Sequence, residues 1–154
     1  TLGQIAGRGE EAEEIVSQMR SDIDGIVSQL EDVDIGPSVF HELDSMLFTV
    51  GPGSFPDEVY SLLKATNVAE STGGAYPQMS AEAVIAAAPE VIILGDADFG
   101  ESAEGVAARP GWDQIPAVVN GRVYGVSAAL LSQPTPRLVD DVRVLAELLY
   151  PEVF

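Results

Sequence analysis

The sequence predicts an α/β fold, in which helices alternate with the strands of a sheet. The segment 74–94 carries most of this prediction, because it contains a loop, a helix, a turn and an apolar strand in immediate succession. Ser80 can cap a helix over 81–88, and Pro89 ends that helix. The run Val91–Leu94 is entirely apolar and mostly β-branched, which is typical of a strand covered on both faces.

A long amphipathic helix over 10–33 is the second observation. Apolar side chains recur there at steps of three and four residues, and acidic side chains crowd the first turns, where the helix dipole favours negative charge. Such a stripe is typical of a helix that packs against a core. The apolar positions are Ala12, Ile15, Val16, Met19, Ile23, Ile26, Val27 and Leu30.

Shorter elements follow the long helix. Residues 37–43 are predicted to form a strand, and 47–50 a second extended piece that ends in a glycine-rich turn. Ser54 can then cap a helix over 55–63. Phe48 lies in the second extended piece, where it is either an ordinary core residue or a residue that contacts a ligand.

The last part of the chain is predicted to contain a loop, a hairpin and a helix. Residues 95–108 are acidic and rich in small side chains, which indicates a solvated loop with one helical turn. Asn120-Gly121 separates two apolar pairs and favours a β-hairpin. A final helix runs to Tyr150 and has an apolar stripe formed by Leu138, Val142, Leu145 and Leu149.

The composition excludes several classes of function. The formal net charge is -18 at pH 7, and such a surface repels nucleic acid and anionic membrane, so neither is expected as a partner. Cysteine is absent, which excludes disulfides, thiolate zinc sites, iron–sulfur clusters and cysteine nucleophiles. The longest apolar runs are too short to cross a bilayer.

The sequence predicts no catalytic residue, no metal ligand and no cofactor. The single histidine, His41, precedes Glu42 in a predicted strand, and strand alternation places the two side chains on opposite faces. A structural role for His41 is therefore favoured over a metal site. The chain contains no nucleophile elbow, metalloprotease motif or dinucleotide-binding motif, so we do not expect an enzyme.

Several motifs, in order along the chain, resemble one family. Residues 76–93 read Tyr-Pro-Gln-x-Ser-x-Glu-x-Val-x-x-Ala-x-Pro-Glu-Val-Ile-Ile, which resembles the second-lobe signature of the helical-backbone substrate-binding proteins of ABC importers. Those proteins deliver vitamin B12, ferric siderophores or haem. Residues 7–12 are similar to the opening of the helix that bridges the two lobes of the family. Residues 109–124 and 134–141 are similar to its late second-lobe pattern and its terminal helix.

The resemblance implies a three-layer α/β/α lobe with a central, mostly parallel sheet, preceded by a long bridging helix. Residues 1–33 would be the interlobe bridging helix and 34–154 the C-terminal substrate-binding lobe, without the N-terminal lobe. The lobe would help to capture an iron-siderophore, haem or cobalamin-type chelate and would dock on a membrane permease. The expected location is extracytoplasmic, either periplasmic or lipid-anchored at the cell surface.

Four site residues follow from the resemblance. Phe48 and Tyr76 lie on loops ahead of helices and would offer aromatic faces to a large, flat ligand. Arg137 would pair with ligand carboxylates, although capping or packing of the final helix is at least as strong an alternative. Glu82 would form a salt bridge with a permease arginine; its alternative role is stabilisation of the helix dipole.

Two further expectations accompany this interpretation. Without a facing lobe, the apolar stripe on helix 10–33 would be partly exposed and could drive formation of a homodimer. The competing hypothesis is a non-transport α/β protein-interaction module. Such a module would need no aromatic residues at a ligand site and would tolerate alanine at Phe48 and Tyr76.

Overall fold

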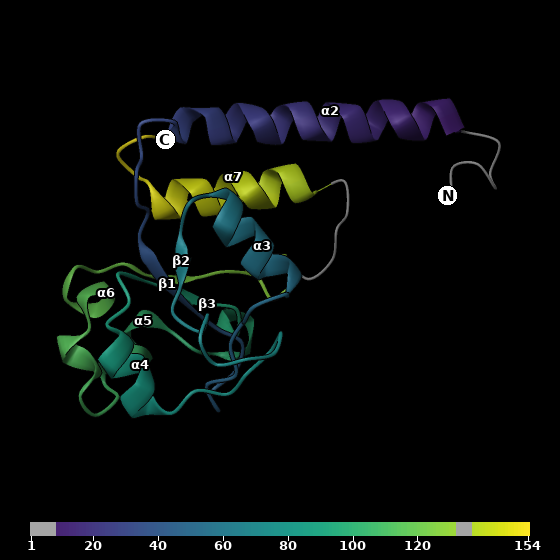
Figure 1. Ribbon diagram of the computed structural model, residues 1–154. Coiled ribbons are helices and arrows are strands. Elements are labelled where there is room, and N and C mark those ends of the chain that lie inside the picture. The colour runs from purple at the N-terminus through teal and green to yellow at the C-terminus, as the bar shows by residue number, and fades with distance from the viewer. Residues whose placement is uncertain (1–8, 132–136) are drawn as a thin grey trace. The chain divides into compact units, whose positions relative to one another are not determined.

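The computed structural model describes residues 9–131 and 137–154, which group into two compact units (Figure 1). The described part of the first unit is 9–32 with 137–154, and that of the second is 33–131. Within these residues, no helix combines the length and the apolar character that a membrane span requires. The predicted division into a bridging helix and a lobe refers to a two-lobed protein and stays a prediction.

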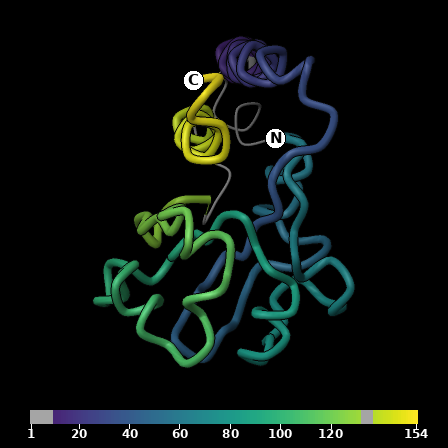
Figure 2. Tube along the Cα trace, turned by 90° about the vertical axis from the view of Figure 1, so that its left-hand side faces the viewer, coloured from purple at the N-terminus to yellow at the C-terminus, as the bar shows by residue number. Residues whose placement is uncertain are grey.

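The first unit contains two helices that lie side by side. Helix α2 (Gly9–Val27) continues into the 3-10 turn η1 (Ser28–Leu30), and α7 (Leu138–Leu149) runs beside α2 in the same direction (Figure 1). Figure 2 looks along the two axes and shows them as adjacent coils. Both helices were expected from the sequence, although positions 7, 8 and 134–136 of its motifs lie outside the described residues.

The apolar stripe of α2 is only partly buried. Ile26 and Leu30, toward its C-terminal end, are buried, whereas Ile15 and Val16 are 53% and 46% exposed. Helix α7 has 12 residues against the 19 of α2, so it is too short to cover the whole stripe. The homodimer expected through this helix stays a prediction.

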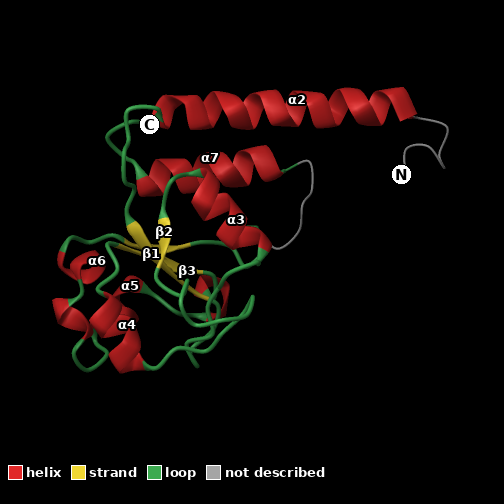
Figure 3. Ribbon diagram, viewed as in Figure 1, coloured by secondary structure: helices red, strands yellow, loops and turns green. Residues whose placement is uncertain are grey.

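The second unit is built on a four-stranded parallel sheet in the order β2-β1-β3-β4. The strands predicted over 37–43 and 91–94 are both present. The sheet occupies the centre of this unit in Figure 3, where its strands are yellow. Its strands are β1 (Ser38–Glu42), β2 (Thr66–Asn67), β3 (Val91–Leu94) and β4 (Val123–Gly125).

Helices cover both faces of this sheet, as the predicted three-layer α/β/α architecture requires. Helix α3 (Phe55–Leu62) lies on one face, where its Tyr60 contacts His41 of β1. The other face packs against α4 (Ala81–Ala87), α5 (Ala103–Ala107) and α6 (Pro116–Val119). The core on that face includes Phe40, Ile92 and Leu94 from the strands and Val84, Val106, Trp112 and Ala117 from the helical segments.

The predicted serine caps are present. The Ser54 hydroxyl accepts a hydrogen bond from the Asp57 amide at 3.3 Å, and the Ser80 hydroxyl accepts one from the Ala83 amide at 3.2 Å. Each therefore satisfies an amide that the first helical turn leaves without a partner. Helix α4 ends at Ala88, whose φ of 49° lies in the left-handed region directly before Pro89.

The predicted hairpin at Asn120-Gly121 is wrong. The residues before it form α6, in which the Asn120 amide donates to the Pro116 carbonyl at 2.9 Å. Pro116 fits the first position of a helix, and this local preference outweighs the hairpin signal. The residues after the turn form β4, which pairs in parallel with β3 rather than with the preceding segment.

His41 makes the stability of the fold depend on pH. Its ring is buried, with Nδ1 2.8 Å from the Tyr60 hydroxyl, and burial lowers the pKa of His41 from 6.5 to about 4. Between these two values the unfolded chain binds a proton that the folded chain does not. The free energy of unfolding therefore falls as the pH decreases from 6.5 toward 4, with a contribution from this group of up to about 3 kcal/mol. Urea unfolding across this range measures the effect.

The matched control is His41→Gln, which keeps a neutral polar side chain beside Tyr60 but cannot titrate. Burial raises the pKa of Glu42 and of Asp96, and these carboxyls act in the opposite direction, adding stability as the pH falls. Their effect is common to both proteins, so the comparison isolates His41. An equally steep loss of stability in His41→Gln would contradict the assignment.

Candidate functional site

The candidate site lies at the carboxyl edge of the parallel sheet, where β1 and β3 end. These two strands are neighbours, and the chain leaves β1 toward β2 on one side of it and later returns to β3 on the other side. The reversal makes the gap between β1 and β3 a topological switch point. Open α/β sheets commonly bind ligands outside the carboxyl ends of the strands at such a point.

Two loops pair with each other at this edge. The loop after β1 and the loop before α4 run antiparallel, with the Thr49 amide donating to the Pro77 carbonyl at 2.9 Å and the Gly51 amide donating to the Ala75 carbonyl at 2.8 Å. Glycine is required at position 51, because a Cβ atom there would lie 2.5 Å from the Gly74 carbonyl oxygen. The two loops therefore form one framework rather than two independent segments.

Phe48 and Tyr76, the two aromatic residues predicted to contact a ligand, both lie in this loop pair. Phe48 pairs with Gln78 in an antiparallel bridge and is half-buried. Tyr76 is two residues from Gln78 on the same loop, and its side chain is 57% exposed. The fold thus brings the two aromatics to neighbouring positions at the sheet edge, whereas their role in binding stays a prediction.

The other two predicted residues belong to other elements of the chain. Glu82 is exposed in the first turn of α4, where hydrogen bonds from its own backbone amide and from the Ser80 hydroxyl lower its pKa. Arg137 directly precedes α7 in the first unit and is exposed. The second unit therefore brings Phe48 and Tyr76 together, and it leaves the carboxylate of Glu82 accessible on a helix end.

Sequence reasoning missed a charged cluster at the same edge. Arg109 donates to both carboxylate oxygens of Glu42, at 2.6 and 2.5 Å, and its Nη2 also donates to Glu101 at 2.9 Å. The guanidinium carbon lies 4.5 Å from the centre of the Trp112 ring, and that ring contacts Phe40 edge-on. Trp112 is buried in the core.

Burial governs the electrostatics of this cluster. The Glu42 side chain is fully buried, and desolvation raises its pKa although Arg109 opposes the rise. The hydrogen bonds that Arg109 donates to Glu42 raise the pKa of Arg109. Asp96 follows β3 and is only 6% exposed; burial raises its pKa, and its Oδ1 has no hydrogen-bond partner. Asp96 and Glu101 line a cavity of about 390 Å³, together with Leu43, Asp44, Ser45, Phe99 and Gly100.

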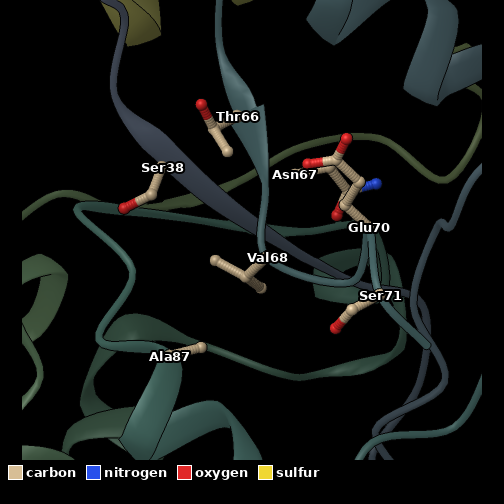
Figure 4. Close-up of a pocket in the computed structure, with 7 residues that line it drawn as sticks. All are labelled: Ser38, Thr66, Asn67, Val68, Glu70, Ser71 and Ala87. Atoms are coloured by element: carbon tan, nitrogen blue, oxygen red, sulfur yellow. The ribbon is translucent and has the colours of Figure 1, made fainter.

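A second cavity of about 390 Å³ lies beside the edge strand β2 and is drawn in Figure 4. It contains none of the four residues predicted from the sequence. Among the described residues that line it, the only ionisable side chain is that of Glu70, and the others are small, polar or aliphatic. No arrangement for catalysis follows from this lining. The residues are Ser38, Thr66, Asn67, Val68, Glu70, Ser71 and Ala87.

Relatives of this chain include an ABC transporter substrate-binding protein and a vitamin B12-binding protein. It is 34% identical to the uncharacterized ABC transporter substrate-binding lipoprotein YvrC of Bacillus subtilis, over 99% of this chain and 49% of that protein. It is 32% identical to a vitamin B12-binding protein of Vibrio cholerae, over 68% of this chain and 37% of that protein. The chain thus spans about half, or less, of the length of these relatives.

Solved structures match the fold. A possible iron-binding (periplasmic solute-binding) protein from Staphylococcus epidermidis has a TM-score of 0.86 and 26% identity, over 97% of this chain and 58% of that one. A periplasmic binding protein from Veillonella parvula has a TM-score of 0.85 and 30% identity, over 97% of this chain and 54% of that one. The family model described as periplasmic binding protein matches residues 1–130. This chain therefore belongs to the periplasmic binding protein family.

Proposed function

We propose that this chain is the C-terminal lobe of an ABC-importer substrate-binding protein. It would capture an iron-siderophore, haem or cobalamin-type chelate together with a facing lobe, and then dock on a membrane permease. The observation that carries the proposal is the 34% identity to an ABC transporter substrate-binding lipoprotein, which extends over 99% of this chain. The vitamin B12-binding relative adds support for a large metal chelate as ligand.

The loop pair at the sheet edge suits such a ligand. Cobalamin, haem and many siderophore chelates are large and partly apolar, and aromatic side chains offer them flat surfaces at little cost in conformational entropy. Tyr76 is exposed and Phe48 half-buried, so the two can present both an accessible and a well-supported ring. The paired backbone holds the loops in place before the ligand arrives, which limits the ordering cost of binding.

The same relatives support an extracytoplasmic location and a binding role without catalysis. One is named as a lipoprotein, and two of the similar structures are described as periplasmic. They favour the transport hypothesis over the competing one, a protein-interaction module. Arg137 remains the proposed partner for ligand carboxylates, because a guanidinium can donate two parallel hydrogen bonds to such a group.

Tyr76→Ala is expected to weaken chelate binding by about tenfold, or about 1.4 kcal/mol, because it removes an exposed aromatic face. Fluorescence titration with haem, cyanocobalamin and a ferric siderophore measures this for the chain and for the longest gene product that contains it. Tyr76→Phe is the matched control, since it keeps the ring, and should retain the affinity. Equal dissociation constants for Tyr76→Ala and the unchanged protein would remove Tyr76 from the site.

Glu82→Gln is expected to impair docking on the permease without changing chelate binding. The measurement is stimulation of ATP hydrolysis by the permease complex in vesicles, with a rise of about tenfold in the half-saturating concentration of binding protein expected for the loss of one charged hydrogen bond.

The chain supplies a matched control at Glu104. Glu104 lies in the first turn of α5 behind the cap Ser102, as Glu82 lies behind Ser80 in α4, and both glutamates are exposed. Glu104→Gln should dock normally. If both variants dock as well as the unchanged protein, the carboxylate of Glu82 acts only on its own helix. If both lose docking to the same extent, the overall negative charge of the surface, rather than Glu82 itself, explains the loss.

A further inference from the structure

We propose that Glu42, Asp96 and Glu101 form a binding site for a hard divalent cation, with Ca²⁺ as the ion that fits best. One carboxylate oxygen from each residue lies within 4.8 Å of the other two. Ca²⁺ binds oxygen ligands at about 2.3–2.6 Å, so two of its ligands can stand about 5 Å apart. A single ion can therefore contact all three residues. This inference does not rest on the proposed transport function.

The unpartnered oxygen of Asp96 points independently to a ligand. Asp96 is only 6% exposed, and its Oδ1 is buried without a hydrogen-bond partner. Leaving a buried carboxylate oxygen unsatisfied is costly, and native structures seldom do so without an ion, a proton or a water nearby. Asp96 also lines the cavity at the carboxyl edge, together with Asp44 and Glu101, so an ion could enter from that side.

The position in the fold is a third argument. Glu42 is the last residue of β1, and Asp96 comes two residues after the last residue of β3. The two strands flank the switch point of the sheet, which is the usual place for a ligand in an open α/β fold. The cluster therefore occupies a site that the topology leaves open rather than a random part of an acidic surface.

The charge balance favours a divalent ion. Arg109 neutralises one of the three carboxylates, so the described cluster keeps two excess negative charges. A divalent cation would cancel them. Arg109 does not block the ligands, because each carboxylate oxygen has two lone pairs and can accept one hydrogen bond while it binds a metal. Arg109 would act as a positioning residue, because its Nη2 donates a hydrogen bond to Glu42 and another to Glu101 and so holds the two carboxylates next to each other.

The ligand chemistry selects among ions. The set consists of carboxylates alone, without histidine or cysteine, which suits Ca²⁺, Mn²⁺ or Mg²⁺ rather than Zn²⁺ or Cu²⁺. Glu101 belongs to a loop outside the strands, and ligands from irregular segments match the flexible coordination of Ca²⁺ better than the strict octahedron of Mg²⁺. Water would complete the coordination on the side of the cavity.

Trp112 provides a direct test in the full chain. It is the only tryptophan in the sequence, and Arg109 lies over its ring while donating to both Glu42 and Glu101. Tb³⁺ is a luminescent substitute for Ca²⁺, and energy transfer from tryptophan falls steeply with distance. Excitation of Trp112 should therefore report Tb³⁺ at this cluster and not at distant surface carboxylates. We expect saturable Tb³⁺ luminescence that Ca²⁺ displaces.

The decisive variants are Asp96→Asn and Glu101→Gln, which keep the side-chain shape and remove a charged ligand. Each should weaken Tb³⁺ binding by about tenfold or more, since affinity at such sites follows the number of charged ligands. Asp113→Asn is the matched control, because Asp113 is exposed and adjoins Trp112 in the chain. It should bind Tb³⁺ as the unchanged protein does.

Circular dichroism checks that each variant is folded. If Asp96→Asn does not fold, the Tb³⁺ affinity of Glu101→Gln tests the proposal. As a second readout, Ca²⁺ should raise the unfolding temperature of the unchanged chain and of Asp113→Asn more than that of the two site variants. Three results would overturn the proposal: no sensitised luminescence, luminescence that Ca²⁺ does not displace, or unchanged affinity in both site variants.

Discussion

The ion pair between Glu42 and Arg109 is the interaction on which the edge of this sheet depends. Glu42 is fully buried at the end of β1, and it tolerates burial because the guanidinium gives it two hydrogen bonds while resting on Trp112. Removing one partner of a buried pair leaves a charge without compensation, which typically costs about 3–5 kcal/mol. The pair thus joins the end of a central strand to the segment that follows α5.

The second unit consists of a framework, formed by the sheet and its helices, and of loops that it displays at its carboxyl edge. The sheet and its helices are held by apolar packing and by the ion pair, whereas the loops after β1 and before α4 are also joined to each other by hydrogen bonds between their backbones. A rigid framework with exposed loops at its carboxyl edge is the usual arrangement for binding in α/β proteins. Phe48 and Tyr76 belong to the displayed part.

Local signals in the sequence predicted most of the framework. The apolar run Val91–Leu94 and the serine caps depend only on residues close together in the sequence. The strand and the helix starts that they indicate could therefore be predicted without knowledge of the fold. The hairpin predicted at Asn120-Gly121 was wrong, because β4 pairs in parallel with β3 and not with the segment before the turn. The contact between Glu42 and Arg109 joins distant parts of the chain, and strand alternation indicated only that Glu42 and His41 face opposite sides.

Asp44 connects the acidic cluster to the loop that carries Phe48. Its Oδ1 accepts hydrogen bonds from the Met46 amide at 2.9 Å and the Phe48 amide at 3.3 Å, so its carboxylate fixes the backbone of that loop. The same residue lines the cavity beside Asp96 and contributes to the raised pKa of that carboxyl. Asp44 therefore lies where the proposed cation site meets the loop that carries Phe48.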